Sequence, residues 1–153
     1  MYRGTVVSLH RAAQAAGAME KLDQAKVVVG KGIEGDRYFA GIGSFSKHPG
    51  EGREVTLIES EALEALAKEK NVELRAGDAR RNVVTRGVPL NHLVGREFQV
   101  GEVRLRGIRL CEPCAHLESL TVAGTLAGLI HRGGLRANVI AGGTIRAGDT
   151  ITE

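Results

Sequence analysis

The chain has 153 residues, a net charge of +3 and an apolar fraction of 42%, which suits one domain with its own hydrophobic core. Its charges of both signs are interleaved and aromatic residues make up only 3%, so we expect no nucleic-acid binding, which needs a basic stripe or stacking platforms. No apolar run approaches the ~20 residues of a membrane span, and two cysteines are too few for a secreted disulfide scaffold. These features predict a cytoplasmic, non-membrane protein.

Short β-branched segments separated by glycine-containing turns predict most of the secondary structure. The segment 102–110 alternates apolar residues with arginines, the period of two typical of a half-buried strand. The predicted strands are residues 4–10, 26–29, 53–58, 82–85, 97–100, 102–110, 135–140 and 144–152, the last with a turn at 146–149. The glycine-rich segment 30–52 has no such period and is predicted to be a functional loop.

One long helix is predicted between Ser60 and Asn71. Ser60 can cap its N-terminus, Glu64 lies four residues before Lys68, and Asn71 is a suitable stop. Its apolar stripe is expected to consist of Leu63, Leu66 and Ala67. A shorter helix is expected after Pro113. Because strands outnumber helices, the pattern favours a mainly β, largely antiparallel barrel or sandwich.

The two cysteines of the chain, Cys111 and Cys114, form a Cys-x-x-Cys pair with four interpretations. Structural zinc needs four ligands, and no second cysteine pair or closely spaced histidine pair completes the set. A redox disulfide of the thioredoxin type needs a βαβ setting, which the surrounding strands do not resemble. Both thiols could also be small buried apolar groups. The fourth interpretation is a single activated thiolate.

Cys114 is the better placed of the two for that last role. Pro113 suits the first position of a helix, which would put Cys114 in the first turn. Unpaired amides there favour the thiolate, and Arg109 on the preceding strand adds positive charge. A thiolate attacks electrophiles and binds soft metals. The residues themselves name neither the metal nor the substrate.

Three clusters flanked by glycine carry the other candidate residues. Asp36 and Arg37 close the segment 32–37, Arg81 and Asn82 follow Gly77, and Arg132 precedes two glycines. Each is explained equally well as a turn or a surface charge pair. Arg80 and Arg81 are adjacent, and adjacent side chains of a strand point to opposite faces, so at most one of them is expected to face a pocket.

In their order along the chain, these motifs resemble the MOSC domain, the molybdenum cofactor sulfurase C-terminal domain. The matching motifs are Gly-Ile-Glu-Gly-Asp-Arg at 32–37, Arg-Glu-Val-Thr-Leu-Ile-Glu at 53–59, Arg-Arg-Asn-Val-Val at 80–84, Pro-Cys at 113–114, Arg-Gly-Gly at 132–134 and Gly-Gly-Thr-Ile-Arg-Ala-Gly-Asp at 142–149. The resemblance covers about residues 28–149. It implies a single domain, residues 1–153, with a MOSC-type β-barrel, one long helix and one or two short helices.

The resemblance also implies a site and a function. In cofactor-binding relatives the Pro-Cys cysteine holds the metal of the molybdenum cofactor (molybdopterin), which makes Cys114 the expected metal ligand and catalytic residue. Asp36 would orient groups or relay protons. The residues expected to help bind the cofactor are Arg37, Arg81, Asn82 and, more weakly matched, Arg132, with Cys111 beside them. The implied activity is that of an oxidoreductase, such as one that reduces N-oxygenated compounds.

The chain departs from larger relatives in ways that affect its partners. It has no room for an additional N-terminal β domain, a sulfurase domain or an iron–sulfur domain, so electrons or sulfur would come from an external donor protein. Pyridoxal phosphate binding is expected only as an association of the wider family. An alternative function is sulfur transfer through a persulfide on Cys114, resolved by Cys111; another is a zinc-stabilised interaction module. In the enzyme hypothesis the substrate is a small molecule, and the oligomeric state stays open.

Overall fold

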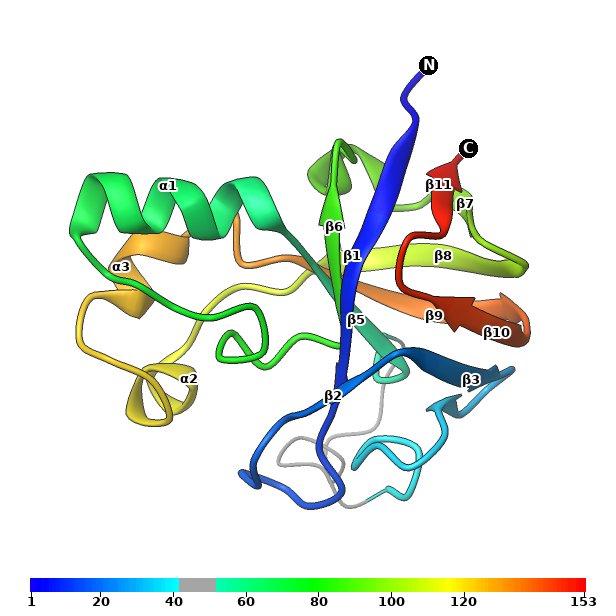
Figure 1. Ribbon diagram of the computed structural model, residues 1–153, viewed down its shortest axis with the longest axis horizontal. Helices are drawn as coiled ribbons and strands as arrows, with labels where there is room; N and C mark the ends of the chain where they lie inside the picture. The colour runs from blue at the N-terminus through cyan, green and yellow to red at the C-terminus, as the bar shows by residue number, and fades with distance from the viewer. Residues whose placement is uncertain (42–51) are drawn as a thin grey trace.

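Seven strands close into a barrel in the computed structural model, which describes residues 1–41 and 52–153. They are β1 (Gly4–Arg11), β5 (Val55–Glu59), β6 (Val83–Arg86), β7 (Glu97–Val100), β8 (Val103–Leu110), β9 (Leu135–Ala141) and β11 (Thr150–Thr152). Their order is β11-β7-β8-β9-β5-β6-β1, and pairing of β1 with β11 closes the ring (Figure 1). The predicted mainly β barrel is therefore confirmed.

Four further strands lie outside this ring. Strand β2 (Glu20–Leu22) continues the sheet beside β1, and β10 (Gly143–Arg146), β3 (Gln24–Val28) and β4 (Gly32–Ile33) form a separate three-stranded sheet. The predicted strand 144–152 is in fact two strands, β10 and β11, separated by its predicted turn. Strands β2 and β4 are too short to carry a period-two pattern, and the sequence analysis missed them. Residues 42–51 of the predicted loop lie outside the described residues.

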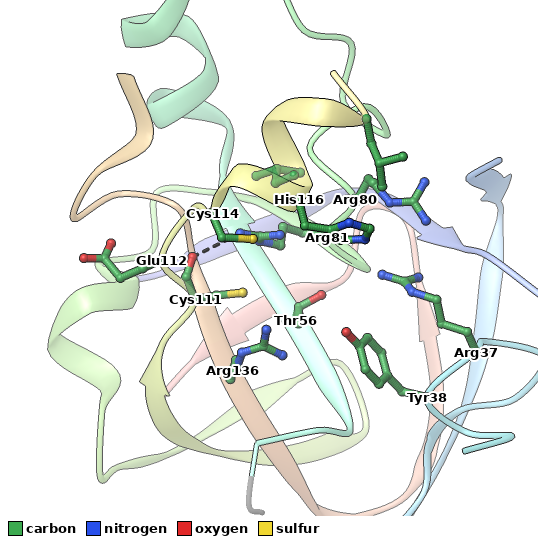
Figure 2. A pocket seen from close by; sticks show the side chains of 12 residues that line it. Arg37, Tyr38, Thr56, Arg80, Arg81, Cys111, Glu112, Cys114, His116 and Arg136 are labelled. Atoms are coloured by element: carbon green, nitrogen blue, oxygen red, sulfur yellow. Dashed lines mark hydrogen bonds between the residues drawn. The ribbon is translucent and has the colours of Figure 1, made fainter. Parts of the chain in front are cut away.

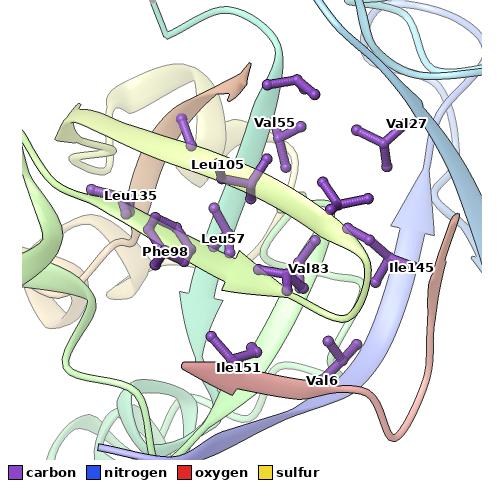
Figure 3. Close-up of a cluster of buried hydrophobic side chains, with 14 of the residues drawn as sticks. Val6, Val27, Val55, Leu57, Val83, Phe98, Leu105, Leu135, Ile145 and Ile151 are labelled. Atoms are coloured by element: carbon purple, nitrogen blue, oxygen red, sulfur yellow. The ribbon is translucent and has the colours of Figure 1, made fainter. Parts of the chain in front are cut away.

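The barrel interior is filled by aliphatic side chains (Figure 3). Phe98 is the one aromatic residue in this cluster of buried side chains, and Leu57, Leu105 and Leu135 are fully buried around it. Strand β5 is covered on both faces, since Leu57 belongs to this cluster and the next residue, Ile58, to a second cluster beneath the helices. A strand buried on both sides has little freedom to shift, so β5 is a rigid base for residues beside it.

The long helix α1 (Ser60–Lys70) connects β5 to β6, which run parallel. A parallel pair needs such a crossover, whereas the other pairs of the barrel are antiparallel. Asn71 ends the helix as predicted: it is left-handed, with φ 53°, and its N–H bonds to the carbonyl of Leu66. No helix in the described part of the chain is long and apolar enough to cross a membrane.

Three details of the predicted helix are wrong. Ser60 is its first residue and not its cap; the cap position is Glu59, whose side chain makes no capping bond. Glu64 pairs with Arg86 on β6, 2.7 Å away, in place of the predicted pair with Lys68. Leu66 is fully buried beneath the helix and Leu63 packs partly buried against the same cluster, as predicted, but the other buried residue is Ala62 and not Ala67.

Two short helices, α2 (Ala115–Ser119) and α3 (Thr125–Leu129), pack with α1 on the outside of the barrel (Figure 1). A 3-10 turn at Leu90–Leu93 contacts β5, β8 and β9. The second hydrophobic cluster joins these helices to the sheet through Ile58, Leu66, Leu117 and Leu129. The segment between β8 and β9, which carries both cysteines, is thereby held against the barrel.

Replacing Leu57 with Ala tests the barrel core. We expect the free energy of unfolding to fall by about 2–5 kcal/mol, because the truncation leaves a cavity between β6 and β9. Val29→Ala is the control, since Val29 is 55% exposed and its truncation should change stability by less than ~0.5 kcal/mol. Urea denaturation measures both; equal effects of the two substitutions would contradict the assignment of Leu57 to the core.

Candidate functional site

Both cysteines lie where β8 leaves the barrel, and neither is in a disulfide. Cys111 is 1% exposed, and Cys114 is partly exposed. Helix α2 begins at Ala115, so Cys114 is its cap residue, in extended conformation (φ −141°, ψ 171°). The prediction that Pro113 opens the helix and Cys114 lies in its first turn is wrong: Cys114 is extended, so the helix begins two residues after Pro113.

Arg81 holds the cysteine segment in place. Its Nη2 donates to the carbonyl of Cys111 at 3.0 Å (Figure 2), its Nε to that of Gly133 at 2.9 Å, and its Nη1 to that of Ala79 at 3.3 Å. The side chain is buried. Charge-assisted bonds of this kind are about twice as strong as neutral ones, so Arg81 ties both ends of the segment between β8 and β9 to the residues before β6.

One pocket contains both thiols and four guanidinium groups (Figure 2). The residues that line it are Arg37, Tyr38, Thr56, Arg80, Arg81, Cys111, Glu112, Cys114, His116, Leu117, Leu120 and Arg136. The carboxylate among them, Glu112, accepts hydrogen bonds from the backbone and ring of His131 at 2.7 and 2.9 Å. The positive charge of the lining is therefore not balanced by its own acids, and the pocket suits an anion.

Two guanidinium nitrogens of this lining lack protein partners. Arg136 Nη1 and Arg80 Nη2 are buried and make no hydrogen bond within the described chain. Figure 2 shows the Arg136 guanidinium directed toward Cys111 and Thr56. Burial, and after it the positive charge of Arg37, lowers the pKa of Arg80. A buried donor without a partner costs about 1–3 kcal/mol, which a bound anion would offset.

Asp36 positions Arg37. Its Oδ1 accepts from the amide of Ala12 at 3.0 Å and from Arg37 Nη1 at 3.3 Å, and its Oδ2 accepts from the amide of Tyr38 at 3.3 Å. The Asp36 side chain is fully buried and does not line the pocket, whereas Arg37 does. The Arg37 guanidinium also lies over the ring of Tyr38, 4.8 Å from its centre. A proton-relay role for Asp36 stays a prediction.

Asn82 joins two strands behind the pocket. Its Oδ1 accepts from the amide and hydroxyl of Thr56 at 3.0 and 3.1 Å, and its Nδ2 donates to the carbonyl of His10 at 3.1 Å. The side chain is buried, and Thr56, not Asn82, lines the pocket. Asn82 thus connects β5 to β1 and fixes the wall that Thr56 presents. Direct cofactor binding by Asn82 stays a prediction.

Arg132 lies apart from the other candidates. Its Nε donates to the carbonyl of Gly128 at 2.7 Å, and its Nη2 pairs with Glu69 at the end of α1. It does not line the pocket. The structure therefore brings together Cys111, Cys114, Arg37 and Arg81, places Asp36 and Asn82 directly behind them, and directs Arg132 toward the long helix.

Comparison with known proteins identifies the family. The family model of the MOSC domain matches residues 45–152. The chain belongs to the MOSC domain family. No curated protein matches its sequence.

The MOSC fold of the chain is also found in solved structures. YuaD of Bacillus subtilis is similar with a TM-score of 0.81 and 16% identity, over 99% of this chain and 97% of that one. YiiM of Geobacillus stearothermophilus is similar with a TM-score of 0.73 and 14% identity, over 97% of this chain and 74% of that one. YiiM of Escherichia coli is similar with a TM-score of 0.66 and 17% identity, over 99% of this chain and 69% of that one. At these identities the similarity shows the fold.

Several pocket residues of this MOSC domain were not predicted. Arg136, Tyr38, Thr56 and His116 line the pocket but were not among the predicted site residues. Alternation within the predicted strand 135–140 could have shown that Arg136 and the apolar Leu135 face opposite sides, but not what Arg136 faces.

The expectation that at most one of Arg80 and Arg81 faces a pocket is wrong, since both line it. Strand β6 begins only at Val83, and Arg80 has φ 62°, so the two residues do not follow strand geometry. The described residues contain no group of three or more His, Cys, Asp or Glu side chains that could hold a metal ion. A metal in this pocket would therefore take few ligands from the protein.

Replacing Asn82 with Ala tests its structural role. The substitution leaves the amide of Thr56 and the carbonyl of His10 buried without partners, so we expect the free energy of unfolding to fall by about 2–4 kcal/mol. Arg132→Ala is the contrast: its ion pair is partly exposed, and we expect a loss below ~1 kcal/mol. Chemical denaturation of both variants is the measurement. An Asn82→Ala loss no larger than that of Arg132→Ala would refute the assignment.

Proposed function

We propose that the pocket binds the molybdenum cofactor, with Cys114 as the protein ligand of the metal. The observation that carries the proposal is the presence, in one pocket, of a partly exposed thiol and a guanidinium nitrogen without a protein partner, Arg136 Nη1. Membership of the MOSC domain family supports it.

The residues of the pocket fit such a group. A thiolate is a soft ligand and suits a soft transition-metal centre better than oxygen ligands do. Guanidinium groups bind phosphate through two parallel hydrogen bonds, and Arg37 and Arg136 both line the pocket. The lining has one carboxylate, Glu112, which is hydrogen-bonded to His131, against four guanidinium groups, so it attracts a phosphate. The donor set therefore matches a metal end and an anionic end of one ligand.

Each residue has a distinct task in this proposal. Cys114 Sγ holds the metal, and Arg37 and Arg136 bind the phosphate. Arg81 positions the segment 111–114 through its bond to the carbonyl of Cys111. Asp36 positions Arg37, and Thr56, supported by Asn82, completes the wall. When bound, the cofactor supplies two-electron redox chemistry at its metal, used here for reducing small N-oxygenated compounds with electrons from a partner protein.

Metal analysis tests the proposal directly. Protein produced in cells that make the cofactor should contain molybdenum and pterin, and Cys114→Ser should lower the molybdenum content at least tenfold, because the hydroxyl is a poor soft ligand. Arg136→Gln should lower the pterin content. The matched controls are Cys111→Ala, for a thiol of the same pocket, and Arg132→Gln, for an arginine outside it. Wild-type protein without molybdenum, or Cys114→Ser with undiminished molybdenum, would overturn it.

A second candidate is sulfur transfer, favoured by the second thiol, Cys111, in the same pocket. The Cys114 thiolate would attack the outer sulfur of a desulfurase persulfide, which forms a Cys114 persulfide and releases the desulfurase thiolate. The Cys111 thiolate would then attack the inner sulfur, which releases hydrosulfide and leaves a Cys111–Cys114 disulfide. The two thiols would thereby carry one sulfur atom and two electrons.

Intact mass spectrometry distinguishes this function. After incubation with a cysteine desulfurase and cysteine, the wild type should gain the mass of a sulfur atom, and Cys111→Ala should retain the gain longer because the resolving thiol is absent. Cys114→Ala should gain none. An unchanged wild-type mass, or an equal gain on Cys114→Ala, removes this function.

A further inference from the structure

A second cavity, of about 580 Å³, adjoins the pocket of the cysteines. Arg80 and Leu120 line both. The rest of its wall comes from His10 at the end of β1, the segment 16–21 and the turn 75–78. The volume lies within the range of about 300–1,000 Å³ typical of sites for small organic ligands. None of these residues has a task in the function proposed above, although Arg80 and Leu120 also line its pocket.

The charges of this second cavity favour an anionic ligand. Its carboxylate, Asp78, is fully engaged by Arg75, which donates to it from the backbone amide, Nε and Nη2 at 3.0–3.3 Å. Lys21 and Arg80 form no ion pair with a carboxylate among the described residues. Both cations therefore remain available for a ligand.

Arg80 is held in a strained conformation beside this cavity. Its φ is 62°, and Ala16 across the cavity has φ 57°, values that residues with a Cβ seldom adopt. Arg80 Nη1 donates to the carbonyl of Gly17 at 2.6 Å, which fixes the guanidinium, while Nη2 is buried without a partner. Strain and an unpartnered donor at the same side chain are features of ligand-binding positions, because the ligand offsets their cost.

The cavity wall also suits a neutral, flat group with polar edges. His10 Nε2 is bonded to the hydroxyl of Ser8 at 2.8 Å, and burial, followed by the charge of Lys21, lowers the pKa of His10. The ring is therefore neutral near pH 7, and because Nε2 is bonded to Ser8, Nδ1 is the ring nitrogen left for a ligand. Apolar surface comes from Ala16, Ala18, Met19, Ala76 and Leu120. The Met19 sulfur is a favourable neighbour for an aromatic ring.

We propose that this cavity binds a nucleoside 5′-phosphate, with the phosphate at Arg80, the base against His10 and the apolar wall around Met19, and the charge of Lys21, which is paired with His10 across β1 and β2, adding to the attraction for the anion. A nucleotide combines the required properties: an anionic group at one end and a flat ring with polar edges at the other. Arg37 and Arg136 line the pocket of the cysteines and not this second cavity. The nucleotide site therefore does not depend on a cofactor at Cys114.

Binding of the four nucleoside 5′-monophosphates, compared with inorganic phosphate, tests the proposal. We expect at least one monophosphate to bind the wild type more than tenfold tighter than phosphate in isothermal titration calorimetry, and to shift the NMR signal of the Met19 methyl group. Ala18→Trp should remove this advantage by filling the cavity, since Ala18 is exposed and its replacement does not disturb the core. Lys21→Ala should weaken binding of the nucleotide.

Matched controls separate this site from its neighbour. Ala13→Trp, an exposed alanine of the same segment outside the cavity, should bind nucleotide like the wild type. Compared in protein produced without the cofactor, Cys114→Ser should also bind nucleotide like the wild type, so that failure of the proposed function and failure of this proposal are distinguished. Monophosphates that bind no tighter than inorganic phosphate, or an Ala18→Trp variant with undiminished binding, would overturn it.

Discussion

The buried guanidinium of Arg81 determines how the cysteine segment sits on the barrel. It joins the carbonyls of Ala79, Cys111 and Gly133, which lie on three separate stretches of chain. Burying a cation is costly unless its donors are satisfied, and here backbone carbonyls satisfy them without a carboxylate. The positive charge of Arg81 is therefore not neutralised by a carboxylate. The same side chain positions the cysteine segment and contributes positive electrostatic potential to the pocket. Substituting it would change both at once.

The accumulation of positive charge around Cys114 is sustained by rigid neighbours. Arg37, Arg80, Arg81 and Arg136 come from different parts of the chain, and their mutual repulsion opposes folding. The doubly covered strand β5 and the buried amide of Asn82 hold the wall against this repulsion. The repulsion among the pocket arginines thus lowers the free energy of unfolding, and burial of the barrel core offsets that loss. Such an arrangement is expected where an anion binds, since the anion removes the repulsion.

The sequence was sufficient for most strands and the long helix because their signals are local, whereas the barrel, as against a sandwich, was implied by the resemblance to the MOSC domain. Alternation in residues 102–110 predicted β8 almost to the residue, and Asn71 marked the end of α1 because a left-handed cap favours asparagine. The resemblance to the MOSC domain predicted that Cys114, Arg37 and Arg81 share one site, and all three line the same pocket. What the sequence could not supply depends on tertiary contacts: the left-handed Arg80, the start of α2 at Ala115, and the direction of Arg136 from β9. None of these leaves a pattern along the chain.

The two cavities are electrostatically connected through adjacent arginines. Arg80 lines both, and the charge of Arg37 in the first pocket contributes to the lowered pKa of Arg80. Arg37 in turn touches the second cavity through Met19, whose sulfur accepts from Arg37 Nη1 at 3.8 Å. An anion bound beside either guanidinium lowers the electrostatic repulsion between Arg37 and Arg80. Once the first anion has removed this repulsion, the second anion cannot gain from removing it again. Two separate anions therefore each gain less when both are bound than when either binds alone, so the shared arginine makes their binding mutually dependent.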